Sequence, residues 1–277
     1  YRMNTHFVNH LHTQDLSGVQ VVDFSYIYSI CKTTLFPHQQ ANLTRMLNIH
    51  NRPTRIQVAD CMPIYFENGL IYDMVADAFI TPEHYTYNVS SGIIIDDPGT
   101  GKTLQFILFM LYVHHESNLK SVVIVPNDDI RDVWVQEFKK HILLPEMPFD
   151  ILTLYNIPAG QLNQYDVIGI DEIHNLYKTN NVHLNTIMTS IVESPIKYRW
   201  GITGTPFVND WSMCSLIKFM CGYNFTNERL ANIKCIMDAF MPMFLKNRKI
   251  DMTTVKLPKL IMHDVYVLLD VMQQGLY

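Results

Sequence analysis

The sequence predicts an α/β fold with a central, mostly parallel sheet and helices on both faces. Two observations lead to it. Short apolar runs alternate with helical stretches from residue 91 onward. Glycine-rich, acidic or threonine-rich segments follow three of these runs, at the sheet edge where such folds bind ligands. The 277 residues, 48% of them hydrophobic and 17% charged, suffice for one large domain or two small ones.

The expected elements follow one another in a regular order. Apolar runs predict strands at residues 93–95, 122–125, 151–155, 167–170 and 198–202. Apolar stripes at helical spacing predict helices at residues 102–115, 130–141, 184–192, near 211–220 and near 228–241. Strands that alternate with helices favour a parallel sheet, because parallel neighbours are joined by crossover connections.

The first third of the chain is less regular. Residues 1–32 form an N-terminal extension with an expected strand at 19–28, and an amphipathic helix begins near Pro37. Residues 51–90 look like an insertion. In it, Asn68-Gly69 lies between two apolar runs, which predicts a β-hairpin, followed by a short helix near 73–79.

Composition excludes several classes of protein. The net charge of −5 lacks the broad basic character of most nucleic-acid-binding domains, so any such contact is expected to be local. The five cysteines include no Cys-x-x-Cys pair, which argues against a zinc ribbon or a disulfide framework and favours an intracellular protein with reduced thiols. No apolar run approaches the ~20 residues of a membrane span, and we expect neither a span nor a signal peptide.

The segment Ser90–Leu104 carries the strongest chemical signal. An apolar strand, a glycine loop, Lys-Thr and an apolar helix are the parts of a phosphate cradle. Backbone N–H groups and the helix N-terminus would face the phosphates, Lys102 would neutralise the β/γ oxygens, and Thr103 would hold Mg²⁺. Asp96 stands where the strict motif has glycine, so the prediction depends on the strand–loop–helix context. The expected nucleotide-binding residues are Gly99, Thr100, Gly101, Lys102 and Thr103.

Two further segments end at the same sheet edge. The strand at 167–170 stops in Asp171 and Glu172, and Mg²⁺ on a nucleotide takes one or two carboxylates, so Asp171 is the natural metal partner. Glu172 could deprotonate the attacking water. The alternative is an ordinary acidic helix cap. The strand at 198–202 runs into Thr-Gly-Thr-Pro, which places hydroxyls at this edge unless it is a simple turn.

The order Gly-x-Gly-Lys-Thr, Asp-Glu-x-His, Thr-Gly-Thr-Pro resembles motifs I, II and III of superfamily-two helicases and translocases. From about residue 33 to the end, the chain looks like the Swi/Snf-type branch. The segments similar to that branch are Leu35 to Gln39, Val125-Pro126, Trp134 to Phe138, Ile202 to Asn209, Phe244 to Asn247, Leu257 to Lys259 and Val271 to Tyr277. Asp171 to Asn175 also resembles poxvirus nucleoside triphosphatase I and early-transcription ATPases, which suggests a large DNA virus as a source.

The resemblance implies a RecA-like P-loop NTPase lobe that uses ATP and Mg²⁺. Residues 33–250 would form this lobe and residues 251–277 a connector toward a second RecA-like lobe, in the same or another chain. Gln39 would read adenine, Lys102, Asp171 and Glu172 would be catalytic, and Thr103 and Asp171 would hold the metal. His174 would couple hydrolysis to Thr203, Gly204 and Thr205. Pro126 and Asn127 would touch a nucleic-acid backbone or relay the nucleotide state.

The implied function is ATP-driven movement on, or remodelling of, DNA, duplex or single-stranded, with RNA as a further option. Without arginine fingers from a second lobe, this chain alone would hydrolyse ATP weakly. Arg199, at the start of a strand, is expected to be structural. The implied location is the nucleus, or the cytoplasm or virion for a viral protein, within a transcription or virion complex. Departures from the branch are Asp97-Pro98, Asn247 and the long insertion.

Two alternatives remain at this point. The lobe could bind nucleotide without cycling, as a structural or regulatory subunit of a viral or transcription assembly. The intact Lys102, Asp171 and Glu172 speak against this reading. A small-molecule P-loop kinase is disfavoured, since it needs neither Gln39 nor the Thr-Gly-Thr-Pro segment.

Overall fold

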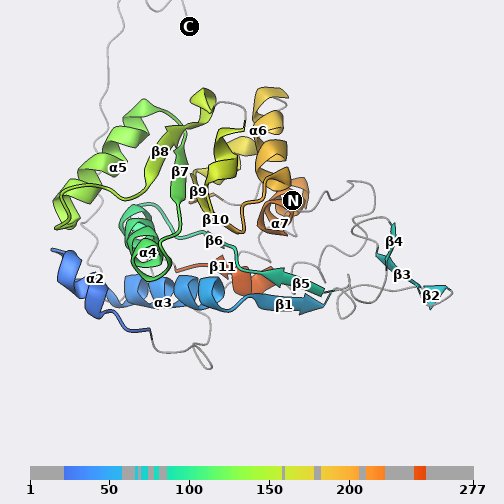
Figure 1. Ribbon diagram of the computed structural model, residues 1–277, viewed down its shortest axis with the longest axis horizontal. Coiled ribbons are helices and arrows are strands. Elements are labelled where there is room, and N and C mark those ends of the chain that lie inside the picture. Colours follow the sequence, from blue (N-terminus) through green and yellow to red (C-terminus); the bar gives the residue numbers. More distant parts are fainter. Residues whose placement is uncertain are drawn as a thin grey trace, which may run out of the picture.

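A six-stranded parallel sheet forms the centre of the molecule (Figure 1). The structure, a computed structural model, describes residues 22–57, 66–67, 70–73, 78–80, 86–157, 160–177, 182–205, 210–221 and 240–247. The strand order is β11-β6-β10-β9-β7-β8, and every neighbouring pair is parallel. The strands are β6 (Gly92–Ile94), β7 (Ser121–Val125), β8 (Asp150–Thr153), β9 (Val167–Asp171), β10 (Tyr198–Ile202) and β11 (Phe244–Leu245).

Helices cover both faces of this sheet, which confirms the predicted α/β architecture. Helix α4 packs against α3 and α5, while α6 packs against α7. The crossover β6–α4–β7 runs across the sheet in the opposite direction to β9–α6–β10, so right-handed connections place α4 and α6 on opposite faces. The helices are α3 (Pro37–Asn51), α4 (Lys102–Ser117), α5 (Asp128–His141), α6 (Val182–Glu193) and α7 (Asp210–Cys221).

Local chemistry sets where these helices begin. Asn127 caps α5, because its side-chain oxygen accepts the Ile130 N–H at 3.0 Å. Acidic residues in the first turn of α5 and basic ones in its last turn suit the helix dipole. The strand predicted at 151–155 is wrong at its end: β8 stops at Thr153 and a 3₁₀ turn, η3 (Leu154–Asn156), follows.

The strand predicted at 19–28 is wrong in its described part, where α2 (Ser25–Ile30) is a helix. The Asp23 carboxylate accepts the Ser25 N–H at 2.8 Å, which favours a helical start. Ile27 and Ile30 are buried, and α2 packs against α4. The sequence pattern is ambiguous here, because the apolar pair Ile27 and Ile30 has helical spacing while the residues before it alternate as in a strand.

The insertion contains two small antiparallel sheets. Strand β1 (Thr54–Gln57) pairs with β5 (Thr86–Val89), and β3 (Leu70–Asp73) pairs with both β2 (Phe66–Glu67) and β4 (Ala78–Ile80). The predicted hairpin pairing is confirmed, although the Asn68-Gly69 turn itself lies outside the described residues. The helix predicted near 73–79 is wrong, because Asp73 belongs to β3 and residues 78 and 79 belong to β4. An isolated helix of this length has little stability of its own. The β2–β3–β4 sheet lies to the far right in Figure 1.

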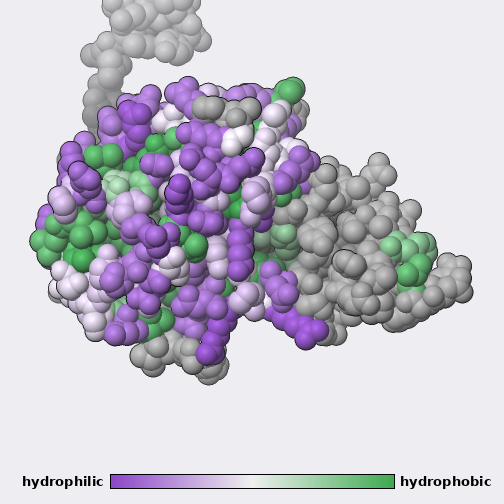
Figure 2. Space-filling model, in the orientation of Figure 1, coloured by the Kyte–Doolittle hydropathy of each residue, from purple (hydrophilic) through white to green (hydrophobic). Residues whose placement is uncertain are grey.

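The core lies between the parallel sheet and its helices. Its largest wholly buried side chains are Trp134, Trp200, Phe106, Phe109, Phe219 and Phe244. Figure 2 shows a largely hydrophilic surface on one face, with hydrophobic residues gathered at the left over α2 and the end of α5. In the described part of the chain, no helix has the length and hydrophobicity that a membrane crossing requires. The helix predicted near 228–241 lies mostly outside the described residues.

Candidate nucleotide site

The phosphate loop joins β6 to α4 and closes around Lys102. Gly99 and Gly101 have φ values of 79° and 81°, which only glycine adopts easily. The Lys102 Nζ donates to the carbonyl oxygens of Asp96 at 2.8 Å and Asp97 at 3.0 Å. The loop backbone therefore wraps an ammonium group at a helix N-terminus, which suits a phosphate ligand. Thr103 is the second residue of α4 and is half-buried beside Lys102.

Gln39 lies directly over this loop. A Cβ atom at Gly101 would lie 2.3 Å from the Gln39 Nε2, and the positive φ of Gly101 favours glycine there. The Gln39 amide donates to the Thr100 carbonyl at 3.4 Å and accepts the Phe36 N–H at 3.0 Å. The structure thus brings the first turn of α3 to the loop, and a contact of Gln39 with adenine stays a prediction.

The ends of β9 and β10 bring together what we call the strand-end cluster: Asp171, Glu172, His174 and Thr203. Glu172 has a φ of 49°, a backbone conformation that is rare for residues other than glycine and costly enough to mark functional sites. The His174 Nδ1 lies 3.0 Å from the Glu172 Oε2 and 2.7 Å from the Thr203 Oγ1. His174 therefore joins the acidic segment to the threonine segment, and its role as a coupling residue stays a prediction.

The threonine segment also abuts the phosphate loop. A Cβ atom at Gly204 would lie 3.4 Å from the Pro98 side chain. The Thr203 Oγ1 accepts the Thr205 N–H at 3.1 Å, so the turn is held by its own hydroxyl. Thr205 itself is exposed. All three predicted motifs thus meet at one edge of the sheet.

Asp171 is held by two hydrogen bonds. Its Oδ2 accepts the indole N–H of Trp134 at 2.8 Å, and its Oδ1 accepts the Glu172 N–H at 3.0 Å. Burial raises the pKa of Asp171, and the bond from Trp134 opposes that shift. Burial lowers the pKa of Lys102, which the nearby carboxylates Asp96, Glu172 and Asp171 oppose. Lys102 therefore interacts electrostatically with the carboxylates of Asp171 and Glu172.

A second set of polar groups, the loop-base cluster, consists of the buried residues Asn42, Asp96 and Gln105 and the partly buried Asn247. The Asn42 Nδ2 donates to the Asp96 Oδ2 and to the Gln105 Oε1, both at 2.8 Å. The Asn247 backbone N–H and side-chain amide donate to the Asp96 Oδ1, and the amide also donates to the Asn42 Oδ1 at 2.8 Å. Burial raises the pKa of Asp96 to about 6, an effect opposed by the bonds from Asn247.

Sequence reasoning missed most of these supporting residues. It treated Asp96 and Asn247 as departures from a pattern, and it did not single out Asn42 or Gln105. Amides have no characteristic spacing, so no local signal marked them. Trp134 was noticed as part of a similar segment, without a role.

Two other predicted residues have structural partners. The Arg199 guanidinium donates to the carbonyl oxygens of Ile191, Val192 and Ser194 at 3.4, 3.5 and 3.0 Å, which satisfies the C-terminal end of α6. This agrees with the expected structural role. The Asn127 side-chain oxygen caps α5, and Pro126 precedes it directly after β7.

The residues at this edge fit ATP with Mg²⁺. Glycines and backbone N–H groups offer a cradle for phosphates, and a desolvated lysine lies inside it. Within the described residues, no group of three or more His, Cys, Asp or Glu side chains could hold a metal ion. Mg²⁺ that arrives on a nucleotide needs only one or two carboxylates, which Asp171 and its neighbour can provide.

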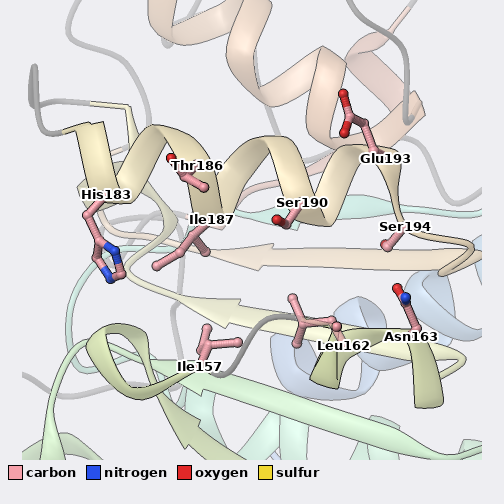
Figure 3. A pocket seen from close by; sticks show the side chains of 10 residues that line it. Ile157, Leu162, Asn163, His183, Thr186, Ile187, Ser190, Glu193 and Ser194 are labelled. Atoms are coloured by element: carbon pink, nitrogen blue, oxygen red, sulfur yellow. The ribbon is translucent and has the colours of Figure 1, made fainter.

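A hollow of about 430 Å³ lies elsewhere, between α6 and the 3₁₀ turn η4 (Gln161–Gln164) (Figure 3). Thr186, Ser190 and Glu193 line it from α6, and Ile157 and Leu162 line it from the opposite side. None of the predicted site residues borders it. The chemistry of the sheet edge and this hollow are therefore separate.

Comparisons with known proteins find a matching family model and two curated relatives. Residues 38–162 match the SNF2-related domain. The ATP-dependent helicase fft1 of Schizosaccharomyces pombe is 25% identical over 244 residues, which cover 68% of this chain and 25% of the relative. The ISWI chromatin-remodeling complex ATPase ISW2 of Saccharomyces cerevisiae is 28% identical over 226 residues, 65% of this chain and 20% of the relative. The chain thus spans a quarter or less of these relatives' lengths.

Solved structures agree on the fold. The Sulfolobus solfataricus SWI2/SNF2 ATPase core domain matches with a TM-score of 0.57 and 18% identity, over 88% of this chain and 49% of that one. The same core in complex with dsDNA matches with a TM-score of 0.51 and 19% identity, over 79% of this chain and 45% of that one. Residues 38–162 thus match the SNF2-related domain, and the chain has the α/β fold of these SWI2/SNF2 ATPase cores.

Proposed function

We propose that this chain is the ATP-binding lobe of a DNA translocase or remodelling ATPase that hydrolyses ATP with Mg²⁺. One observation carries the proposal: Lys102, the Asp171–Glu172 pair and the His174–Thr203 contact come from three strand ends and meet at one sheet edge. Phosphoryl transfer depends on positioning and charge neutralisation, which this arrangement supplies.

Each residue has a separate task in this proposal. Residues 99–103 bind the phosphates, and Lys102 neutralises charge on the β and γ oxygens. Thr103 and Asp171 hold Mg²⁺, which supplies further charge neutralisation when it is bound. Glu172 orients a water molecule and accepts its proton. Gln39, over Gly101, selects the base.

Coupling runs through His174. Its imidazole bridges Glu172 and the Thr203 hydroxyl, and a Cβ atom at Gly204 in the same turn would lie 3.4 Å from Pro98. A change in the Glu172 carboxylate during hydrolysis therefore alters hydrogen bonds in residues 203–205. This route would carry the nucleotide state to a nucleic-acid contact made by the same turn or by Pro126 and Asn127.

The DNA partner is inferred from relatives. One structural neighbour is a SWI2/SNF2 ATPase core in complex with dsDNA, and one curated relative is a chromatin-remodeling complex ATPase. A second RecA-like lobe, in the same or another chain, would complete the site beyond a connector at residues 251–277. We place the ATPase lobe itself at residues 33–250, after an extension at 1–32, and expect it to act inside the cell, in a transcription or virion complex if the source is viral.

The test is steady-state ATP hydrolysis with no DNA, single-stranded DNA and duplex DNA. Lys102→Ala should bind nucleotide at least about 100-fold more weakly and abolish turnover, because it removes the charge in the cradle. Lys140→Ala is the control, since that lysine is exposed on α5. The proposal is supported if DNA stimulates turnover and Lys102→Ala abolishes that turnover. The form of DNA that stimulates turnover, single-stranded or duplex, then identifies the substrate along which the protein moves.

Residues 33–250 by themselves should hydrolyse ATP slowly, and a second RecA-like lobe should raise this turnover. Nucleotide binding without turnover under every condition, including with a second lobe, would instead favour a non-cycling subunit. Failure to bind nucleotide at all would refute the ATPase proposal.

A further inference from the structure

Trp134 is wholly buried on α5, yet its one polar atom reaches the predicted metal site. The indole Nε1 donates to the Asp171 Oδ2 at 2.8 Å. Trp200 offers a comparison, because it is equally buried and its Nε1 has no hydrogen-bond partner among the described residues. Burial of an indole thus does not by itself require a partner in this molecule.

The ring of Trp134 is held in place by the helix that follows the phosphate loop. Phe106, in α4, packs edge-on against it, with ring centroids 6.1 Å apart and an interplanar angle of 77°. Phe106 in turn lies against Gly169, where a Cβ atom would come within 2.3 Å of the Phe106 ring. Gly169 and Asp171 project from the same side of β9, since side chains alternate along a strand. The packing therefore fixes where the indole N–H points.

This bond restricts the Asp171 carboxylate. With Oδ2 bonded to Trp134 and Oδ1 bonded to the Glu172 N–H, rotation of the carboxylate would break both bonds. An indole is only a donor, so it stabilises the ionised form that a metal requires. Each oxygen keeps a lone pair for a further ligand.

We propose that Trp134 is a positioning residue that holds the Asp171 carboxylate ready for the Mg²⁺ carried by the nucleotide. This rests on the proposed function, because it assumes that Asp171 is a metal ligand. Residues that hydrogen-bond to metal ligands typically change metal affinity by about 10- to 100-fold when they are replaced.

The test compares Trp134→Phe with Trp200→Phe in the intact chain. Both substitutions shorten a buried aromatic side chain and remove an indole N–H, but only the first breaks a hydrogen bond. The measurement is binding of N-methylanthraniloyl-ADP across a Mg²⁺ titration and in EDTA. Trp134→Phe should raise the Mg²⁺ concentration for half-maximal effect about 10-fold or more and leave binding in EDTA unchanged, whereas Trp200→Phe should match wild type.

An identical Mg²⁺ dependence in the two variants would overturn the inference alone, while wild-type chain that binds no nucleotide would overturn the proposed function with it. A second measurement avoids loss of the Trp134 side chain. The sequence has three tryptophans, so Trp200→Phe combined with Trp211→Phe leaves Trp134 as the sole indole. Its emission should change on addition of ADP with Mg²⁺ and stay constant with ADP in EDTA; the same response in both solutions would contradict a link to the metal.

Discussion

The loop-base cluster and the strand-end cluster lie at the same sheet edge but are built from different chemistry. In the loop-base cluster, the Asp96 carboxylate accepts hydrogen bonds from Asn42 of α3 and from Asn247, two residues after β11, and Asn42 also bonds Gln105 of α4. In the strand-end cluster, a histidine lies between a carboxylate and a hydroxyl, and a backbone turn is in a rare conformation. The first arrangement has its bonding positions filled and fixes the loop. The second places an imidazole in contact with a carboxylate and a hydroxyl at the ends of two strands, where a change at the carboxylate can reach the threonine segment.

The largest expected effect is a loss of ATP turnover without a loss of stability, caused by a substitution in the strand-end cluster. Glu172→Gln should lower ATP turnover by about 10²- to 10⁴-fold, because a general base is lost. Nucleotide affinity and the free energy of unfolding should stay near wild type, since the side chain is partly exposed. Glu116→Gln, on the exposed end of α4, is the control. Turnover within threefold of wild type would remove Glu172 from the catalytic role.

The next prediction concerns the pH dependence of stability in the loop-base cluster. The pKa of Asp96 is about 6 in the folded chain against 3.8 for an unperturbed carboxyl group, so the folded state binds this proton more tightly. Its contribution to stability is fully present below pH 3.8 and is lost as the pH rises through about 6. The full change amounts to about 3 kcal/mol.

Asp96→Asn removes this titration. It also places an amide donor against other donors, so the variant should be less stable than wild type, and most clearly so at low pH. The free energy of unfolding in urea, measured for both proteins between pH 4 and 7, should show a difference that shrinks as the pH rises. A difference that stays constant across this range would show that Asp96 does not titrate there.

A smaller effect should follow removal of one amide from the same cluster. Asn247→Ala leaves the Asn42 Oδ1 without its donor and should cost about 1–3 kcal/mol of unfolding free energy. Nucleotide binding should also weaken, because Asp96 begins the phosphate loop. Asn163→Ala is an exposed control. If both variants unfold at the same urea concentration, the cluster does not stabilise the loop.

The smallest effect is expected at the contact between the two strand ends. Thr203→Val keeps the shape of the side chain and removes the hydroxyl that bonds His174 and the Thr205 N–H. ATP binding should be unchanged, and stimulation of turnover by DNA should fall several-fold. The substitution weakens the link between the nucleotide site and the DNA contact but leaves the residues that hydrolyse ATP in place. Equal DNA stimulation in variant and wild type would argue against coupling through His174.

The comparison of the clusters also explains what could be predicted from sequence. The strand-end cluster and the phosphate loop before Lys102 were predicted because each follows an apolar strand, and parallel strands end at one edge. The order of neighbours in the sheet was not foreseen, and neither was the loop-base cluster. Asn42 and Gln105 are 63 residues apart, and Asn42 and Asn247 are 205 apart, so their contact depends on docking of whole elements.

The errors had local causes. Around residues 19–28 an alternating apolar pattern competed with an Asp-x-Ser helix start, and packing of Ile27 and Ile30 against the lobe favoured the helix. Near residues 73–79 the apolar residues pair across two strands, as Ile71 with Ile80 and Tyr72 with Phe79. Single-segment patterns do not contain such pairings.

The position of β6 has a consequence for how the protein is made. Both neighbours of β6 in the sheet come much later in the chain: Arg199 bonds Ser91 across 108 residues, and Asn247 bonds Asp96 across 151. A ribosome that has just synthesised the phosphate loop therefore holds a strand with no partner. The nucleotide cradle is completed only when residue 247 has emerged, and closing such long loops slows folding. ATP should thus stabilise the nascent chain only at the end of the lobe's synthesis.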